Sequence, residues 1–413
     1  MTTAPPFPGP VVRRAKWATT AAFVASGFAF TSWASRIPST SSRLGLSTGE
    51  VGLVLLALAA GSVLALPLAG AVIARLGSRR VVQLAAVLLV VTMLGIAWGI
   101  TVGVAPVVVA LFGLGLAYGA WDVAMNVEGA VVEAHVGRTV MPRFHAGFSV
   151  GTVAGALLGS LMIRLDVSVS EHLAAVAVLV LLVVPASVRA FVPDGSSTVA
   201  PEDVVPAPEA PATRPGALTA WREPRTLMVG VFVLAFAFAE GTANDWTALA
   251  MIEGYGVAES VGTLTFAVFL TAMTVGRWFG TSWLDRWGRV PVVRTLAAVA
   301  LVGLLLFVLA PAPWLAAVGA ALWGLGTSLG FPLGMSAAAD DPARAPARVS
   351  VVASVGYVAF LTGPPLIGLL GEAAGLLRAL SVVAVLLVLA LAVSRAIRPL
   401  RPATAQDRRA TTA

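Results

Sequence analysis

Twelve long apolar runs dominate this sequence and leave few folds open to it. Each run has about the 20 residues that an α-helix needs to cross a bilayer. Unpaired backbone groups are costly in lipid, so the choice is a helical bundle or a β-barrel, and the runs lack the polar–apolar alternation of barrel strands. The sequence predicts an all-α integral membrane protein with twelve transmembrane helices near 17–37, 51–74, 81–100, 105–127, 144–165, 172–192, 226–250, 260–283, 291–310, 314–337, 347–371 and 376–394.

Composition and charge agree with a membrane protein. Of the 413 residues, 58% are hydrophobic and 11% charged, whereas about a quarter of an ordinary soluble chain is charged. The net charge of +7 could suggest a nucleic-acid partner, but basic residues that alternate with apolar runs are typical of membrane orientation. With the N-terminus in the cytoplasm, four Lys and Arg residues fall outside and Arg277 falls within a run, which leaves 22 of the 27 on the cytoplasmic side. We therefore predict a multi-pass protein of the cytoplasmic (inner) membrane with both termini cytoplasmic and no nucleic-acid partner.

A segment rich in Pro and Ala, and broken by acids, divides the runs six and six. Such a composition cannot bury a core, so it is predicted to be a linker. The first run follows Arg13, Arg14 and Lys16 but ends without a convincing cleavage site, so it is predicted to be a retained helix. The expected organisation is a cytoplasmic tail (1–16), a six-helix half (17–192), a cytoplasmic linker (193–225), a second six-helix half (226–394) and a cytoplasmic tail (395–413).

A repeat with an offset of 211 residues relates the two halves. LFGLGLAYG at 111–119 matches LWGLGTSLG at 322–330, and RLGSR from Arg75 matches RWGRV from Arg286. Two separated matches at one offset indicate duplication even in a chain with 41 glycines. Because six spans return the chain to the same side, the repeat is predicted to be parallel, with two pseudo-symmetric halves.

The loops after the second and eighth runs carry a motif that resembles the major facilitator superfamily, whose loop reads G-x-x-x-D-R-x-G-R-R. Ala74 stands where the family usually has Asp, a departure that bears on the gate contact of the first half. The motif residues that the chain keeps are Gly70, Arg75, Gly77, Arg79, Arg80, Asp285, Arg286, Gly288 and Arg289. The resemblance covers essentially the whole chain and implies the family's fold, gate contacts at these loops and transport of a solute. RIPSTSSRLGLS, DVAMN, VGRTVMPRFHAGFS and EGTANDW are further similar to a sugar-permease-like branch that includes the MosC-type proteins.

The fourth run carries Tyr118, Asp122 and Asn126, which are spaced four apart and so lie on one helical face. Counted from the outer end, Asp122 lies about 24 Å deep, which is within the bilayer. An ionisable group there is a functional hypothesis by default, and Asp122 could carry a proton during part of a transport cycle. The alternative is an interhelical hydrogen bond without a transport role.

The seventh run carries Glu240 and Asn244 on one face, and Asp245 is turned aside from it. Glu240 lies about 21 Å from the cytoplasmic end, so it could belong to a proton or solute pathway, or it could be buried in a pair with an arginine. The resemblance implies that the first, fourth, seventh and tenth helices line one central cavity, which would place Glu240 and Asp122 on the same route. Asp245 is equally suited to solute contact and to an interfacial role or outer gate.

Four further residues are candidates for the pathway or for gating. Arg277 lies within the eighth run, where it could reach the cytoplasm or neutralise Asp122. His145 could exchange protons or lie at the interface. Arg36 could bind a polyol or act as an interfacial anchor, and Trp323 is assigned to the solute cavity.

The fifth run argues against an enzyme although it contains GFSVG, which matches the G-x-S-x-G motif of hydrolases. That motif needs a strand-to-helix turn, and here it lies within a predicted helix. Glycines that recur every four residues already predict a helix-packing strip; they are Gly147, Gly151, Gly155 and Gly159. No Walker lysine or metal-binding spacing occurs in the sequence, so we expect no cofactor and no metal.

These patterns predict a secondary active transporter that works as a monomer by alternating access of two six-helix halves. The expected cargo is a small polar solute, sugar-like or polyol-like by resemblance, coupled to protons because carboxylates occur within the spans. An efflux transporter of amphipathic drugs or metabolites is the main alternative. A membrane sensor and an intramembrane hydrolase are remote ones.

Overall fold

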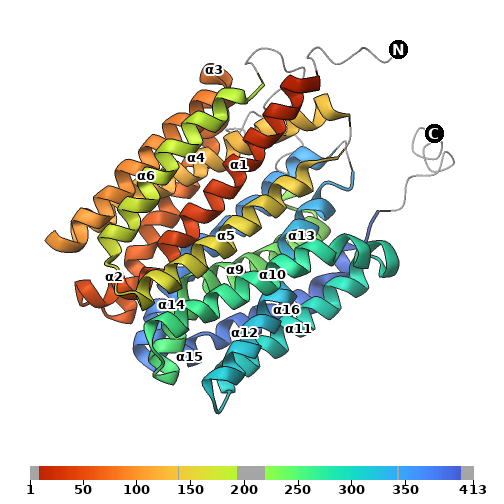
Figure 1. Ribbon diagram of the computed structural model, residues 1–413. Coiled ribbons are helices and arrows are strands. Elements are labelled where there is room, and N and C mark those ends of the chain that lie inside the picture. Colours follow the sequence, from red (N-terminus) through yellow and green to blue (C-terminus); the bar gives the residue numbers. More distant parts are fainter. Residues whose placement is uncertain (1–8, 138, 193–218, 342–343, 401–413) are drawn as a thin grey trace, which may run out of the picture.

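The computed structural model describes residues 9–137, 139–192, 219–341 and 344–400, and within these ranges it contains helices and no strands. The all-α prediction is therefore confirmed. The predicted linker falls largely on residues 193–218 and the predicted tails partly on residues 1–8 and 401–413, all of which lie outside the described residues. The helices (Figure 1) are α1 (Gly9–Ala34), α2 (Ile37–Leu44), α3 (Thr48–Val102), α4 (Val104–Val136), α5 (Met141–Arg164), α6 (Val169–Ser187), η1 (Val188–Ala190), α9 (Pro224–Tyr255), α10 (Glu259–Trp287), α11 (Arg289–Leu309), α12 (Pro313–Thr327), α13 (Gly330–Ala338), α14 (Ala345–Ala374), α15 (Leu376–Ala379), α16 (Ser381–Val393) and η2 (Ser394–Ile397).

Ten helical segments of the described chain are long and apolar enough to cross a membrane. One of them, α3, has 55 residues and contains two predicted spans on either side of Gly77. The α12–α13 pair counts as one segment. With α3 counted twice and α1 added, the arrangement fits the predicted twelve helices.

The predicted repeat is visible in the backbone. Gly77 has φ 79° and ψ 157°, and Gly288, 211 residues later, has φ 77° and ψ 167°. Residues other than glycine rarely adopt a positive φ of this kind. The two loops therefore turn in the same way at equivalent positions, as expected for a duplicated unit.

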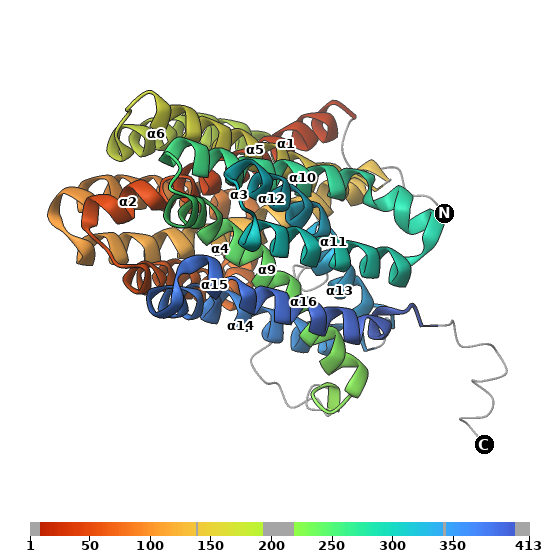
Figure 2. The same cartoon turned by 90° about the horizontal axis from the view of Figure 1, so that it is seen from below.

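The helices form two groups, α1 to α6 and α9 to α16, which lie side by side (Figure 2). Within the first group, the glycine strip of α5 packs against α1, where Cβ atoms at Gly151 or Gly155 would clash with the backbone of α1. This confirms the predicted packing role of the strip. Between the groups, α3 contacts α14 and α5 contacts α10. We call the end of the bundle with α2 and α15 the distal end, and the end where α1 begins and α16 ends the terminal end (Figure 1).

Two local features differ from the sequence prediction. The segment after the first span forms the short helix α2, which begins with Pro38 in its first turn and ends at the left-handed Gly45. The predicted tenth span is broken at Ser328 and Leu329 into α12 and α13. Its counterpart α4 is continuous from Val104 to Val136.

Candidate solute pathway

The described residues of the two halves hydrogen-bond to each other at the distal end. The Gly49 amide donates to the Glu372 carboxylate at 2.9 Å, and the Thr48 hydroxyl lies 3.4 Å from Glu253. The Ser39 hydroxyl donates to Glu259 at the start of α10. The remaining bonds of this kind, Ser160 to the Ser260 carbonyl and Thr263 to the Ser35 carbonyl, lie at the same end. The halves are thus joined distally, and no such bond joins the described residues at the terminal end.

The predicted face of α4 is present and faces the other half. Asp122 is exposed and forms no ion pair with a described residue. The Asn126 amide donates to the Asp122 backbone oxygen at 2.8 Å and to its Oδ1 atom at 3.3 Å. Tyr357 of α14 lies within electrostatic reach of the Asp122 carboxylate. Tyr118 packs edge-on against Phe30 of α1 at 5.6 Å, and its buried hydroxyl has no hydrogen-bond partner in the part of the chain that the structure describes.

Glu240 and Arg277 form an ion pair within the second half. Arg277 Nη2 lies 2.9 Å from Glu240 Oε1, and Arg277 Nε donates to the Ser328 carbonyl at 3.3 Å. Arg277 therefore neither pairs with Asp122 nor extends to the terminal end. The arrangement is the arginine pair considered as the alternative for Glu240, and it leaves the charge of Asp122 uncompensated by a described residue.

The neighbouring polar residues of α9 have fewer partners. Asp245 is partly exposed and forms no ion pair with a described residue. The Oδ1 atom of Asn244 and the hydroxyl of Thr247 are buried and have no hydrogen-bond partner among the described residues. These atoms remain available to a polar solute or to water.

Two of the predicted pathway residues, Trp323 and Arg36, lie elsewhere. The Trp323 ring is fully buried against Phe269 and Phe307, at 5.4 and 6.0 Å, so it packs inside the second half. The ring is enclosed by these two side chains, and the structure does not bring it to the face of Asp122. Arg36 is buried at the distal end, where it donates to the Val167 carbonyl.

His145 lies near the start of α5 and packs edge-on against Phe23 at 5.2 Å. It lies within electrostatic reach of Arg277 from the opposite half. His145 is thus nearer to the Glu240–Arg277 pair than its sequence position indicates.

The predicted gate residues of the first half make contacts within that half. Arg79 donates to the Phe191 carbonyl at 2.8 Å, and Arg75 is exposed. Glu128 is buried, and its carboxylate accepts hydrogen bonds from the Ser78 hydroxyl and the Val192 amide, both at 2.8 Å. The sequence favours a solvated or paired loop charge for Glu128; the structure shows a buried residue that ties the loop to the end of the half.

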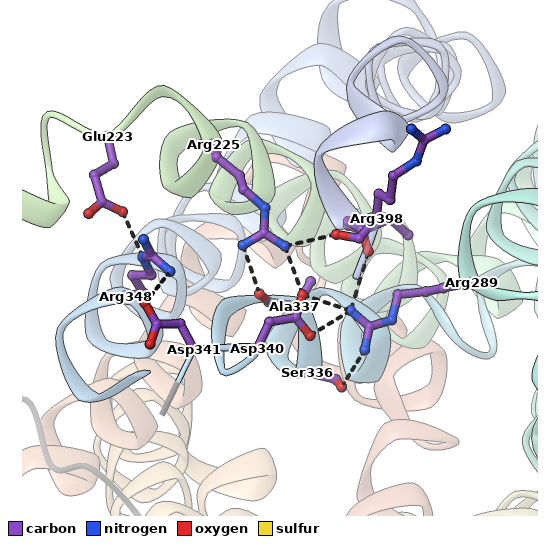
Figure 3. Close-up of polar contacts among 10 residues, drawn as sticks. Glu223, Arg225, Arg289, Ser336, Ala337, Asp340, Asp341, Arg348 and Arg398 are labelled. Atoms are coloured by element: carbon purple, nitrogen blue, oxygen red, sulfur yellow. Dashed lines mark hydrogen bonds and ion pairs between the residues drawn. The ribbon is translucent and has the colours of Figure 1, made fainter. Parts of the chain in front are cut away.

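Of the predicted gate residues of the second half, Arg289 belongs to a cluster of arginines and acids at the terminal end (Figure 3). Asp340 accepts from Arg225 at 2.8 Å and from Arg289 at 2.9 Å. Asp285 is exposed and makes no ion pair in the described chain, and Arg286 lies over the Trp287 ring at 5.4 Å. The motif arginine Arg289 thus pairs with an acid that the motif does not contain.

A second part of this cluster surrounds Glu223, which precedes α9. Arg348 Nε donates to its carboxylate at 2.7 Å and Arg344 Nη1 at 3.2 Å. The hydrogen bond from Arg348 lowers the pKa of Glu223, assisted by the Thr226 hydroxyl. Asp340 and Glu223 were not identified from the sequence as partners of the loop arginines. The signal for them was their position next to basic loop residues.

Comparison with known proteins agrees with this architecture. The model of the major facilitator superfamily matches residues 18–342 and 242–413. The chain belongs to the major facilitator superfamily. It is therefore a multi-pass membrane transporter and not an enzyme.

Two relatives of this superfamily member cover most of the chain. An uncharacterized transporter of Sinorhizobium fredii is 32% identical over 86% of this chain and 90% of its own length. Membrane protein MosC of Rhizobium meliloti is 28% identical over 87% and 84%, which agrees with the predicted branch.

Solved structures share the fold at low sequence identity. The nucleoside transporter NupG has a TM-score of 0.69 at 15% identity and covers 94% of this chain and 98% of its own. A D-xylose–proton symporter has a TM-score of 0.69 at 11% identity and covers 95% and 99%. At these identities the similarity establishes the fold alone.

Proposed function

We propose that this transporter moves a small polar solute, sugar-like or polyol-like, by alternating access coupled to protons. The observation that supports the proposal best is the Asp122 carboxylate, which is exposed on a polar face of α4 and has no ion-pair partner among the described residues. An ionisable group within a span is costly and is usually kept for function. Binding a proton there would remove the charge during part of the cycle.

The solute is proposed to bind between α4 and α9. Tyr118 and Asn126 offer a hydroxyl and an amide beside Asp122, and Asn244 offers a carbonyl oxygen without a partner. Asp245 supplies a second carboxylate on α9. Polar groups that are left unpaired favour a solute with several hydroxyl groups over an apolar one, because each lost hydrogen bond is costly in a buried site.

The protein is proposed to be a monomer in the inner membrane with both termini in the cytoplasm. With this orientation, the distal contacts support an inward-facing state. Alternating access requires the halves to separate at one end while they meet at the other. Here the hydrogen bonds between the described parts of the halves lie at the distal end. The sugar–proton symporter of the same fold makes proton coupling a reasonable expectation.

Transport by purified protein in liposomes with an imposed pH gradient tests the proposal. The panel contains sugars, inositols, nucleosides and amphipathic dyes, and proton movement is recorded with solute uptake. We expect gradient-driven accumulation of a polar solute, which Asp122→Asn abolishes. Asp166→Asn is the matched control, because Asp166 is an exposed loop residue with φ 54°, a conformation that Asn adopts readily.

Three outcomes would contradict the proposal. Accumulation of dyes without any polar solute would indicate an exporter of amphipathic compounds. Proton movement without solute, or uptake that Asp122→Asn leaves unchanged, would remove the assigned coupling role.

A further inference from the structure

The break between α12 and α13 has a chemical cause in Pro332. Proline has no backbone N–H, so the carbonyl four residues earlier in a helix, here that of Ser328, lacks its helical donor. Arg277 of α10 donates from Nε to this oxygen at 3.3 Å. The regular pattern resumes with the Leu333 amide, which donates to the Leu329 carbonyl at 3.1 Å. The guanidinium thus replaces the hydrogen bond that the proline removes.

The same guanidinium binds the acidic residue of α9. Its Nη2 atom lies 2.9 Å from Glu240 Oε1, and the two side chains are 26% and 22% exposed. A guanidinium holds its donors in fixed directions, so Arg277 can serve both acceptors at once, which a lysine ammonium does less well. A change of charge at Glu240 therefore acts on the group that completes the helix break.

The far end of α13 is also held by arginines (Figure 3). Arg225 donates to the Ala337 carbonyl at 3.3 Å and binds Asp340, just after the helix. Arg289 binds Asp340 as well and donates to the Ser336 hydroxyl at 3.2 Å. The nine residues of α13 consequently lie between one arginine at the break and two at the terminal end.

The neighbouring helices α9 and α10 pack closely against the break, so a small shift of their side chains displaces the backbone there. A Cβ atom at Gly276 of α10 would clash with the Ser328 side chain, and one at Gly330 of α13 would clash with the Phe236 ring of α9.

The first half lacks both the ion pair and the proline of this arrangement. At the offset of 211, the counterparts of Glu240, Arg277, Ser328 and Pro332 are Ala29, Leu66, Ala117 and Trp121.

We propose that Arg277 is a positioning residue that makes the placement of α13 depend on the charge of Glu240. While Glu240 is ionised, Arg277 is fixed between the carboxylate and the Ser328 carbonyl, and the break is rigid. Neutralisation of Glu240 by a proton or by solute releases Arg277, and α13 then moves as a unit relative to α12. This role in transport rests on the proposed function, but the coupling itself is a property of the protein without solute.

Cysteine reactivity can test the coupling directly, because the sequence contains no natural cysteine. The probe is Ala338→Cys, at the last residue of α13, where the native side chain is 3% exposed. The rate of its alkylation by N-ethylmaleimide is measured on the full chain in lipid nanodiscs, at one pH and without solute. Constant pH also keeps the protonation state of His145 constant, which is a titratable group within electrostatic reach of Arg277.

We expect Glu240→Gln to raise the alkylation rate at position 338 about fivefold or more, the change that roughly 1 kcal/mol produces in an equilibrium. Arg277→Gln should do the same. Pro332→Ala restores a backbone donor for Ser328, so in that background Glu240→Gln should change the rate by less than about twofold. A merely structural ion pair would instead give the same effect with and without the proline.

The matched control is Val127→Cys, the counterpart of position 338 in α4, where the native side chain is 6% exposed. Its alkylation rate should not respond to Glu240→Gln. An equal rise at both positions would indicate general loosening and overturn the proposal, as would an unchanged rate at position 338 in both Glu240→Gln and Arg277→Gln. Absence of solute transport would refute the proposed function and leave this result standing.

Discussion

The two halves share a backbone plan but place their polar groups differently. Gly77 and Gly288 turn the chain alike at the offset of 211. Along α4, however, Asp122 is exposed and makes no ion pair with any described residue, and the corresponding residue of α13 is the buried Leu333. In the second half Glu240 of α9 pairs with Arg277, whereas Asp245 of the same helix makes no ion pair with a described residue.

This difference suits two proposed tasks within one duplicated scaffold. An unpaired carboxylate can gain or lose a proton without breaking an ion pair, whereas a paired one is held until its partner is displaced. The continuous α4 and the broken α12–α13 follow the same division. Under the two proposals above, we expect the first half to supply a reversible charge at Asp122 and the second half a change of shape linked to charge.

The largest expected effect comes from making the first half resemble the second. Asp122→Leu introduces the residue found at the equivalent position 333, and solute uptake driven by a pH gradient should fall by about 100-fold, the range for loss of a proton-transfer group. Asp122→Asn should keep exchange of solute between two sides at equal pH while losing the response to the gradient. Uptake and counterflow in liposomes measure the two activities. Equal loss of both in Asp122→Asn would argue that Asp122 binds solute and carries no proton.

A second substitution makes the second half resemble the first. Arg277→Leu, which matches Leu66, leaves the partly buried Glu240 without its counter-ion and should lower stability by about 2–3 kcal/mol. Adding Glu240→Ala, which matches Ala29, should restore part of that loss, because it removes the unpaired carboxylate. The bond from Arg277 to the Ser328 carbonyl stays lost in both variants. Thermal unfolding in detergent measures both. If the double variant is as unstable as the single one, the pair contributes through packing and not through charge.

Most of the fold follows from the sequence, because lipid restricts the options so strongly. The long apolar runs predict the helices, the offset of 211 predicts the duplication, and the glycine strip of α5 predicts one contact between helices. The break at Ser328 was not predicted, although Pro332 was available as a signal, since prolines are tolerated in spans such as that of Pro67 in α3.

The site was predictable only where one helix carries it. Tyr118, Asp122 and Asn126 share a face by their spacing alone. The partner of Arg277 depends on how α9 and α10 pack, and the spacing of residues along one helix contains no such information. Trp323 illustrates the same limit, because its ring could be assigned to the cavity or to the core until Phe269 and Phe307 were seen around it.

A smaller effect tests how closely the loops of the two halves correspond. Gly77→Ala and Gly288→Ala each place a side chain at the same unfavourable φ, so each should cost about 1–2 kcal/mol of stability. The two losses should agree within about 0.5 kcal/mol and should add in the double variant, because the loops lie in separate halves. Chemical or thermal unfolding supplies the values. A much larger loss at Gly288 would show that its loop is held more rigidly, through Arg289 and Asp340.

The smallest effect concerns the terminal end of the second half, where Glu223 binds Arg344 and Arg348 and the equivalent residue of the first half is Val12. The bond from Arg348 holds the pKa of Glu223 below its usual range, so the folded state gains stability from the ionised carboxylate at pH values above the usual pKa of about 4.3. That gain should disappear as the pH falls through the lowered pKa, and solvent limits it to about 0.5 kcal/mol. Unfolding temperatures between pH 7 and the acid limit should therefore fall slightly less for Glu223→Gln than for the native protein. The control is Asp285→Asn, at an exposed carboxylate with no ion pair in the described chain, which should keep the native pH profile of the unfolding temperature. If Glu223→Gln also keeps the native profile, the contacts of Glu223 add nothing to stability. The terminal ends of the two halves would then not differ in stability through this residue.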